Sequence, residues 1–453
     1  MSKYFLAIIG GGPAGYTAAE KASKAGKDVV LFEQNAVGGT CLNVGCIPTK
    51  SLLYGAKQYY NAAHAQKYGV TAENVTFDFA AMQKRKTIVV RKLVAGIKQR
   101  LNNEHCTLVS GFAKVENRTD ELVTISCNDQ TYEAENLMIC TGSTNFVPPI
   151  PGIKDNPAVW DSTDALAATE LPKSIIIVGG GVIGMEFATL YHELGVAVTV
   201  IEALPSILPN LDPEVVAILA DKYRKAGINI LTETKVESID GNTVTISSSS
   251  SSTSLTSLTS DKILVSVGRR ANLNGLEALN ELELNRGAIV IDDFCKTNLP
   301  NVYACGDVTG KIMLAHVASR QAEVAIGRML KQIPLQRIAY NAIPSVVYTN
   351  PEIASVGITE AQAADMKIET EVRKLPMTFS GRFMAENEGE TGLCKMIIDA
   401  KNHSVLGVHM IGNPCSEFVS AASFAVRMGY TTAEFQQVVF PHPTVSEILH
   451  EIV

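Results

Sequence analysis

The sequence predicts an α/β protein with two doubly wound parallel sheets, followed by an α+β domain at the C-terminal end. Two segments, residues 4–33 and 174–202, share one plan: an apolar strand, a glycine-rich turn, a helical run and a second strand that ends on glutamate. A strand–turn–helix–strand segment is a βαβ unit, and such units build parallel sheets. The chain of 453 residues is also too long for a single hydrophobic core. We therefore expect about three domains.

Composition narrows the classes of function. The net charge of −7 disfavours a broad nucleic-acid-binding surface. No apolar stretch approaches the roughly 20 residues of a membrane span, and the apolar run at the N-terminus breaks at Gly10, before it reaches signal-peptide length. The nine cysteines, an odd number scattered along the chain, disfavour a secreted disulfide framework. We therefore expect a soluble cytoplasmic protein with no membrane span.

The rest of the chain indicates how these domains are arranged. Residues 247–260 are almost entirely Ser, Thr and Leu, so we expect a flexible hairpin or loop there; a phosphoserine tract is the less favoured alternative. From about residue 339 strands alternate with turns, and a helical run covers residues 417–428, which is typical of an α+β domain. The expected segments are the first βαβ-containing domain in two parts (1–147 and 271–338), the second such domain (148–270) and the C-terminal domain (339–453).

Each βαβ unit carries three glycines and a glutamate at the spacing of a Rossmann-like dinucleotide-binding site. In both copies the glutamate, Glu33 or Glu202, follows the middle glycine by 21 positions. The glycines permit a tight turn and let the backbone approach a pyrophosphate, while the helix N-terminus attracts its negative charge. Well-packed turns without a ligand are the alternative, which two complete copies disfavour. The predicted glycines are Gly10, Gly12 and Gly15 in the first copy and Gly179, Gly181 and Gly184 in the second.

Glu202 also predicts which nicotinamide nucleotide binds. A carboxylate at this position accepts hydrogen bonds from a ribose diol but repels a 2′-phosphate. The two residues that follow, Ala203 and Leu204, supply no compensating arginine. We therefore expect the second site to prefer NAD to NADP.

Cys41 and Cys46 form a close pair inside a glycine-rich stretch, residues 37–50. A zinc site is the obvious alternative, but zinc needs further ligands and none stands nearby in sequence, so we expect no metal. Residues five apart on an ideal helix have Cα atoms roughly 8–9 Å apart, whereas a disulfide tolerates about 4.4–6.8 Å. If the pair is bridged, the stretch is not regular helix. Gly45 and Pro48 agree with this, and we predict a distorted segment that becomes regular helix only beyond Pro48.

A histidine and a glutamate near the C-terminus are candidates for proton transfer. His442 stands between two prolines, and Glu447 follows five residues later. A histidine in such a setting is more often structural, but dithiol chemistry needs a base and the ordinary pKa of histidine suits neutral pH. A carboxylate on the other ring nitrogen would fix the tautomer, which is the role expected for Glu447.

Residues 38–50, Gly-Gly-Thr-Cys-Leu-Asn-Val-Gly-Cys-Ile-Pro-Thr-Lys, resemble the active-site motif of the pyridine nucleotide–disulfide oxidoreductases. Within that family the motif is most similar to the members that oxidise dihydrolipoamide, and the resemblance covers essentially the whole chain. It implies FAD at the first site, NAD at the second and a redox-active disulfide between Cys41 and Cys46. Cys46 would then lie against the flavin and Cys41 would exchange with substrate. Lys50 would lie near the flavin, paired with Glu186.

The same resemblance implies further contacts and a dimer. In this family the His–Glu pair reaches into the site of the neighbouring subunit, so His442 and Glu447 would complete the partner's site in a homodimer. The His442–Pro443 peptide bond is expected to be cis, and residues 344–357 resemble the family's dimerisation signature. One departure is Phe-Pro at residues 440–441, where His-Ala is common. The implied cofactor contacts are Gly39, Thr40, Lys50, Thr141, Gly142, Asp307, Ala315 and His316 for FAD, and Glu186 and Gly268 for NAD.

The expected reaction takes electrons from dihydrolipoamide through the Cys41–Cys46 disulfide and FAD to NAD⁺. The resemblance also implies service in a 2-oxoacid dehydrogenase or glycine-cleavage complex, with possible docking on an acyltransferase core. Two alternatives stay open. One is a reductase of glutathione or another disulfide, which would require basic groups for the substrate's carboxylates and usually an NADP site. The other is a structural subunit that docks on such a core without chemistry of its own.

Overall fold

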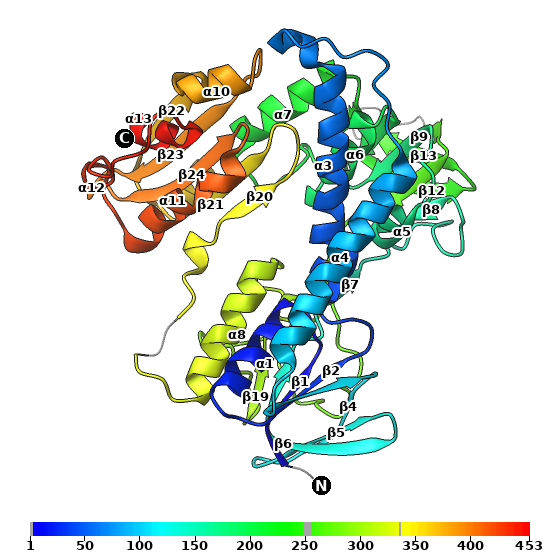
Figure 1. Ribbon diagram of the computed structural model, residues 1–453, viewed down its shortest axis with the longest axis vertical. Helices are drawn as coiled ribbons and strands as arrows, with labels where there is room; N and C mark the ends of the chain where they lie inside the picture. Colours follow the sequence, from blue (N-terminus) through cyan, green and yellow to red (C-terminus); the bar gives the residue numbers. More distant parts are fainter. Residues whose placement is uncertain (1–2, 249–254, 335–336) are drawn as a thin grey trace. The chain divides into compact units, whose positions relative to one another are not determined.

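The computed structural model describes residues 3–248, 255–334 and 337–453 (Figure 1). The chain divides into two compact units. Unit 1 comprises Met1–Ser51, Ala81–Phe146 and Gly268–Ile338, and unit 2 comprises Leu52–Ala80, Val147–Val267 and Ala339–Val453. The finer division into four segments stays a prediction.

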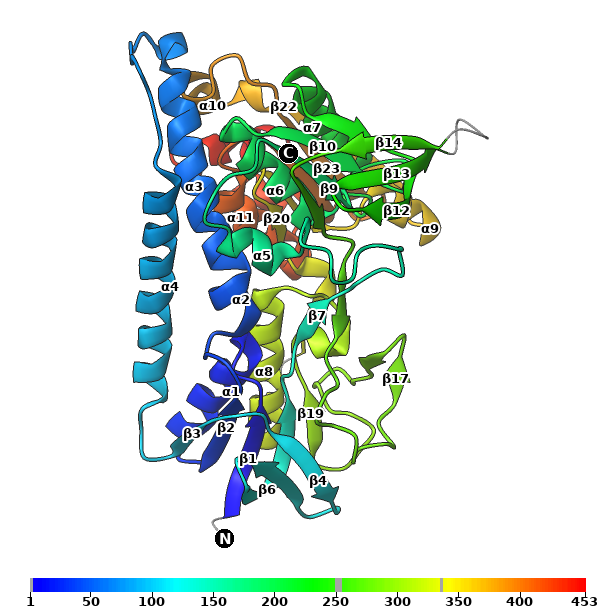
Figure 2. The same ribbon diagram turned by 90° about the vertical axis from the view of Figure 1, so that its right-hand side faces the viewer.

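Unit 1 is built on a seven-stranded sheet whose central strands are parallel. Its central strand reads Leu6-Ala-Ile-Ile9 and is buried, as a strand covered on both faces requires. Helices α1 (Pro13–Lys24) and α8 (Ala315–Met329) pack side by side (Figures 1 and 2). The parallel strands are β1 (Lys3–Ile9), β2 (Val29–Glu33), β3 (Cys106–Ser110), β6 (Gln130–Ile139) and β19 (Val302–Ala304), and the antiparallel ones are β4 (Lys114–Arg118) and β5 (Val123–Cys127).

The first half of unit 2 contains the second βαβ segment and the serine-rich hairpin. Its parallel sheet has the order β11-β10-β9-β15-β8, and helix α6 (Val182–Glu193) follows β9. Strands β13 and β14 pair antiparallel, as in a hairpin. The expected flexibility of this segment stays a prediction, since residues 249–254 lie outside the described residues. The strands are β8 (Val159–Trp160), β9 (Ser174–Val178), β10 (Ala197–Ile201), β11 (Asn229–Leu231), β12 (Thr234–Asp240), β13 (Thr243–Ser248), β14 (Thr256–Thr259) and β15 (Lys262–Val265).

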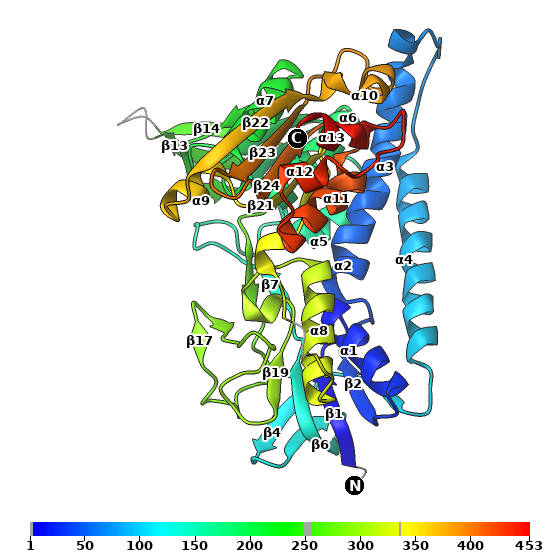
Figure 3. The same ribbon diagram turned by 90° about the vertical axis from the view of Figure 1, so that its left-hand side faces the viewer.

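The C-terminal part of unit 2 is an antiparallel sheet with helices, which confirms the expected α+β architecture. The strand order is β20-β21-β24-β23-β22, and helix α11 (Cys415–Met428) packs against β21 and β24 (Figure 3). This helix begins two residues before the predicted run at residue 417. The strands are β20 (Ser345–Val347), β21 (Ile353–Gly357), β22 (Thr370–Pro376), β23 (Leu393–Asp399) and β24 (Val405–Ile411).

Candidate active site

The first glycine turn, in unit 1, has the shape of a phosphate cradle. Gly10 has φ +104°, and a Cβ there would lie 2.2 Å from the carbonyl oxygen of Cys140. A Cβ at Gly15 would lie 1.8 Å from the carbonyl oxygen of Gly10, so both positions require glycine. At Gly12 a Cβ would meet only the Cα of Gly39, at 3.8 Å. Gly12 precedes α1 and provides no side-chain cap, so the helix's first N–H groups can serve as donors to a pyrophosphate.

Glu33 lies at the end of β2, beside this cradle. One carboxylate oxygen accepts a hydrogen bond from the backbone N–H of Gly11 at 2.7 Å, and the other accepts from the N–H of Asn35 at 2.8 Å. These bonds fix the carboxylate next to the turn. Each oxygen retains a lone pair for a ribose hydroxyl.

The second glycine turn, in unit 2, repeats this arrangement. Gly179 has φ +106°, and a Cβ at Gly184 would lie 2.0 Å from the carbonyl oxygen of Gly179. A Cβ at Gly181 would meet nothing within 4 Å. Glu202 accepts a 2.8 Å hydrogen bond from the backbone N–H of Gly180 and another, also of 2.8 Å, from the backbone N–H of Leu204. The two turns therefore offer equivalent cradles for two dinucleotides.

Asp307 is held by a chain of hydrogen bonds that the sequence did not reveal. The hydroxyl of Ser143 donates to the Asp307 carboxylate at 2.6 Å, and Nε of Arg269 donates to the same hydroxyl at 2.7 Å. The hydroxyl of Thr141, an expected FAD contact, donates to the carbonyl of Asn272 at 2.6 Å. Ser143 and Arg269 could have been found, because each directly follows a strand that closes on glycine, at Gly142 and Gly268.

Gly268, which we expect to contact NAD, belongs to unit 1. Its backbone has φ +124°, and its carbonyl accepts a 3.0 Å hydrogen bond from the N–H of Phe146. Its predicted role at the NAD site stays a prediction.

The stretch with the paired cysteines is an interrupted helix. Helix α2 (Gly39–Val44) ends at Gly45, whose φ and ψ of −145° and −110° are not helical, and α3 begins at Cys46 and continues to Ala63. The predicted break is confirmed, but the expectation of regular helix only beyond Pro48 is wrong. Pro48 is tolerated because it stands in the first turn of α3, where the backbone N–H has no partner in the helix anyway.

Side chains hold this break in place. The side-chain amide of Asn43, a residue that the sequence did not single out, donates to the carbonyls of Ala36, Val37 and Gly39 at 3.0–3.3 Å. The hydroxyl of Thr49 donates to the carbonyl of Gly45 at 2.6 Å. Both cysteines are therefore presented from a rigid support.

Cys41 and Cys46 are both thiols, and their side chains are hydrogen-bonded to each other. This hydrogen bond, together with burial, raises the pKa of Cys41 well above its ordinary value, while the nearby Lys50 acts in the opposite direction. The two sulfurs are not bridged in this structure, and the disulfide that the family resemblance implies stays a prediction. Because exchange with a disulfide proceeds through a thiolate, such a pair needs a base that takes up its proton.

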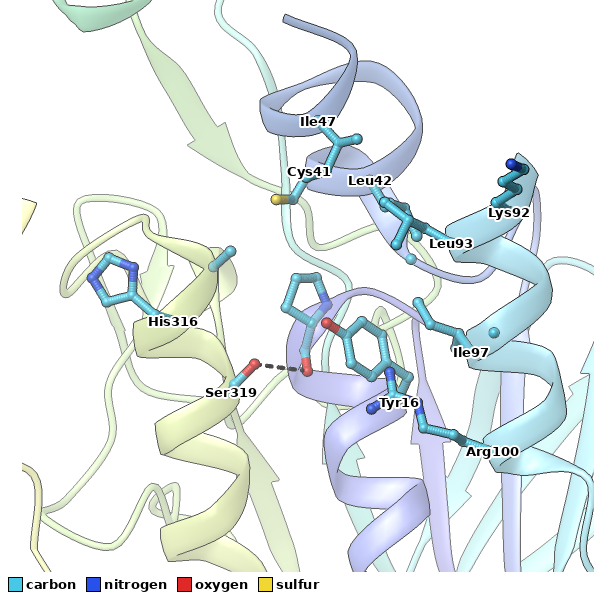
Figure 4. Close-up of a pocket in the computed structure, with 14 residues that line it drawn as sticks. Tyr16, Cys41, Leu42, Ile47, Lys92, Leu93, Ile97, Arg100, His316 and Ser319 are labelled. Atoms are coloured by element: carbon cyan, nitrogen blue, oxygen red, sulfur yellow. Dashed lines mark hydrogen bonds between the residues drawn. The ribbon is translucent and has the colours of Figure 1, made fainter. Parts of the chain in front are cut away.

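Cys41 lines a cavity of about 580 Å³ within unit 1 (Figure 4). Tyr16 rises from α1 toward the cysteine, and burial and the proximity of Cys41 raise its pKa. Two cations from α4 (Phe79–Leu101), Lys92 and Arg100, line the opposite wall. Sequence reasoning had singled out Cys41, Ala315 and His316, but not Tyr16 or the two cations. The lining residues are Pro13, Tyr16, Gly38, Cys41, Leu42, Ile47, Lys92, Leu93, Gly96, Ile97, Arg100, Ala315, His316 and Ser319.

Two glutamates on α6 in unit 2 are buried. Glu186 accepts a 3.1 Å hydrogen bond from the backbone N–H of Tyr348. Glu193, two turns further on, accepts a 2.7 Å bond from the side-chain amide of Asn350, and burial raises its pKa to about 7. The sequence pointed to Glu186 but not to Glu193. Pairing of Glu186 with Lys50 stays a prediction, since the two residues belong to different compact units.

His442 and Glu447 form the expected pair. Nδ1 of the histidine lies 2.8 Å from Oε1 of the glutamate, and the His442–Pro443 bond is cis, as predicted. The backbone N–H of Thr444 donates to Oε2 of Glu447 at 2.8 Å; this bond and the one with His442 lower the pKa of the carboxyl. The histidine side chain is 79% exposed. Its other ring nitrogen is therefore available to a group outside this fold.

Membrane-spanning helices and metal-binding clusters are both absent from the part of the chain that the structure describes. No helix in residues 3–248, 255–334 and 337–453 is long and apolar enough to cross a membrane. The same ranges contain no cluster of three or more His, Cys, Asp or Glu side chains that could bind a metal ion.

Comparison with known proteins identifies the class. The profile of the family "Pyridine nucleotide-disulphide oxidoreductase" matches residues 4–322, and the family's dimerisation domain matches residues 343–453. The chain belongs to the pyridine nucleotide–disulphide oxidoreductase family, which confirms the resemblance seen in the sequence. The dimerisation domain supports a homodimer.

Individual proteins of known name are similar to this chain over nearly its whole length. Dihydrolipoyl dehydrogenases from Geobacillus stearothermophilus and Bacillus subtilis are each 36% identical over 98% of this chain and 94% of theirs. Among solved structures, the HOCl-induced flavoprotein disulfide reductase RclA from Escherichia coli has a TM-score of 0.85 at 30% identity, covering 99% of both chains. LpdA from Mycobacterium tuberculosis has a TM-score of 0.89 over 100% of this chain and 99% of its own. At 23% identity that likeness shows the fold alone.

Proposed function

We propose that this protein is an FAD-dependent enzyme that oxidises dihydrolipoamide to lipoamide and reduces NAD⁺ to NADH. Relatives named dihydrolipoyl dehydrogenase match nearly its whole length. The observation that carries the proposal is the combination of two dinucleotide cradles with one close dithiol, Cys41 and Cys46, at a cavity. Dihydrolipoamide loses two electrons and two protons as its S–S bond forms. NAD⁺ gains a hydride, and one proton is released.

The chain's own residues supply binding and proton handling. The glycine turn at Gly10–Gly15, Glu33 and Asp307 would hold FAD, and the turn at Gly179–Gly184 with Glu202 would hold NAD. When bound, FAD supplies two-electron transfer between the dithiol and the nicotinamide. Lys50 and Glu186 belong to this proposal as residues near the flavin.

Disulfide exchange would take place at Cys41. In the oxidised enzyme, one substrate thiolate attacks Cys41, breaks the Cys41–Cys46 bond and leaves the electron pair on Cys46. The second substrate thiolate then displaces Cys41, which closes the lipoamide ring and leaves the enzyme as the dithiol. His442, oriented by Glu447, accepts the thiol protons.

We place this His–Glu pair at the site of the partner subunit in a homodimer. The exposure of the imidazole and the dimerisation domain that contains it support this arrangement. Docking of the dimer on an acyltransferase core and residence in the cytoplasm also stay predictions.

One assay tests the proposal. The purified protein should carry flavin and reduce NAD⁺ with dihydrolipoamide, with much weaker activity on NADP⁺ or reduced glutathione. Cys41→Ser should retain flavin and lose turnover by at least about a thousandfold, since a hydroxyl cannot exchange with a disulfide. A colourless protein without turnover would favour the structural-subunit alternative.

A second candidate is reduction of glutathione disulfide or another disulfide at the expense of NADPH or NADH. The 30% identity to a flavoprotein disulfide reductase and the two cations that line the Cys41 cavity favour it. Robust turnover of glutathione with NADP⁺ in the same assay would establish this candidate instead.

A further inference from the structure

Helix α4, which forms one wall of the Cys41 cavity, has an unusual charge. Its 23 residues include seven lysines and arginines and no aspartate or glutamate, although the whole chain has a net charge of −7. Two of these cations, Lys92 and Arg100, line the cavity, and none of the lining residues is acidic. The electrostatic potential in the cavity is therefore positive.

The two cations are not equivalent. Arg100 lies 3.2 Å from the carboxylate of Glu20 and stacks over the ring of Tyr16, with 5.6 Å between the guanidinium and the ring centroid. Arg100 is thus already paired with a carboxylate, which it shares with Lys24. Among the residues that the structure describes, none forms an ion pair or a hydrogen bond with Lys92. Its ammonium is the cation that an incoming anion can use.

The rest of the cavity wall suits an aliphatic chain. Leu42 and Leu93 lie between Cys41 and Lys92 (Figure 4). A substrate with a dithiol at one end, methylene groups in the middle and a carboxylate at the other end matches this order of sulfur, apolar and cationic groups. The apolar lining residues are Leu42, Ile47, Leu93 and Ile97.

We propose that the cavity recognises a carboxylate on the dithiol substrate, with Lys92 as the residue that determines this specificity. The inference rests on the proposed function and refines it. Free dihydrolipoate ends in a carboxylate, whereas dihydrolipoamide ends in a neutral amide. The attraction between this carboxylate and Lys92 therefore raises kcat/KM for dihydrolipoate relative to kcat/KM for dihydrolipoamide.

The test compares kcat/KM for dihydrolipoate and for dihydrolipoamide, each with NAD⁺, in the flavin-loaded enzyme. Lys92→Met should lower the ratio of dihydrolipoate to dihydrolipoamide about threefold to fivefold, the range of an exposed ion pair. Lys92→Glu should lower it further, to about a tenth of the wild-type value or less, because like charges repel. Raising the salt concentration should reduce the wild-type ratio and leave that of Lys92→Met nearly constant.

Lys98→Met is the matched control. Lys98 is an exposed cation of the same helix that does not line the cavity, so this variant should keep the wild-type ratio. Equal flavin absorbance in all variants shows that each is folded and loaded. An unchanged ratio in Lys92→Met and Lys92→Glu, with dihydrolipoamide still oxidised, overturns the inference alone. If neither dithiol reduces NAD⁺ in the wild type, the proposed function itself fails.

Discussion

The two βαβ segments share a turn but differ in the helix that follows it. Gly10 and Gly179 have φ values of +104° and +106°, and in each turn a glutamate accepts a hydrogen bond from the second glycine. At equivalent positions of the two helices, however, α1 has Lys24 and α6 has Glu193. The side chain of Lys24 is 68% exposed, whereas Glu193 is buried.

This difference shows that the local sequence motif defines a nucleotide cradle but not its surroundings. Helix α1 presents its outer face to water, with basic residues in the last turn. Helix α6 is buried over most of its length and uses two glutamates to bond Tyr348 and Asn350 of the C-terminal part of unit 2. The helix that follows the second cradle is therefore bonded to another part of its unit through two buried glutamate side chains.

Adding a methyl group to each turn should have the largest effect on nucleotide binding. The two substitutions should also distinguish the FAD site from the NAD site. Gly15→Ala puts a Cβ 1.8 Å from a backbone oxygen, and Gly184→Ala puts one at 2.0 Å. Overpacking of this kind costs about 1–3 kcal/mol, or roughly a tenfold to hundredfold loss of affinity. We expect Gly15→Ala to lose flavin absorbance, and Gly184→Ala to keep it but bind NADH weakly. Gly381→Ala, where a Cβ meets nothing within 4 Å, is the control; loss of flavin in both turn variants would contradict the assignment.

Removing the buried charge of α6 should raise stability in a pH-dependent way. The pKa of Glu193 is about 7 in the fold and about 4.5 in the unfolded chain, so the native state binds more protons between these values. Stability therefore falls as pH rises through this window, by up to about 3 kcal/mol. Glu193→Gln should unfold at higher denaturant concentration than wild type at about pH 8, and this gain should shrink by about 2 kcal/mol at about pH 5.

The equivalent change in α1 should do almost nothing. Lys24 lies 2.7 Å from Glu20 on the surface, and exposed ion pairs contribute at most about 1 kcal/mol. If Lys24→Gln stabilised the fold as much as Glu193→Gln does, burial of the charge would not be the cause of the stabilisation.

Neutralising the two cradle carboxylates should affect different nucleotides. Glu202→Gln keeps an acceptor for the N–H of Gly180 but removes the charge that repels a 2′-phosphate. We expect the ratio of kcat/KM for NADP⁺ to that for NAD⁺ to rise about tenfold. Glu33→Gln should weaken flavin retention and leave this ratio unchanged. The ratio is measured by steady-state kinetics with dihydrolipoamide.

A smaller effect on nucleotide binding than that of the glycine and glutamate changes is expected at two serines, Ser143 and Ser266, one at each site. Ser143→Ala removes the 2.6 Å hydrogen bond to Asp307 and should weaken flavin binding about fivefold, the value of one ordinary hydrogen bond. Ser266 instead donates to the carbonyls of Val178 and Gly179, at 3.3 and 3.2 Å. Ser266→Ala should therefore leave flavin affinity unchanged, as measured by flavin release during titration with denaturant.

The sequence alone determined the two cradles, the paired cysteines and the His–Glu pair. In the cradles, the spacing of glycine and glutamate is dictated by short-range steric contacts, such as that between Gly15 and the carbonyl of Gly10. His442 and Glu447 are only five residues apart, and a local turn brings them together at 2.8 Å. Such features depend on contacts between residues a few positions apart, so the sequence alone is enough to predict them.

The tertiary structure alone decided where the break between the cysteine helices ends and which charges are buried. Asn43 and Thr49 fix the break at Gly45, so the helix resumes at Cys46 rather than beyond Pro48. No local pattern distinguishes a buried cation from an exposed one, because burial depends on partners far away in the chain.

Lys395 illustrates the point. Its side chain is 1% exposed, and its ammonium lies 2.8 Å from Asp212 and 2.7 Å from Glu214, with Glu360 as a third partner. Burial alone would lower the pKa of this lysine, but the hydrogen bonds to the three carboxylates raise it above its ordinary value. Lys92 of the Cys41 cavity is the opposite case: its side chain is exposed, and only the folded unit places it on a cavity that no acidic residue lines.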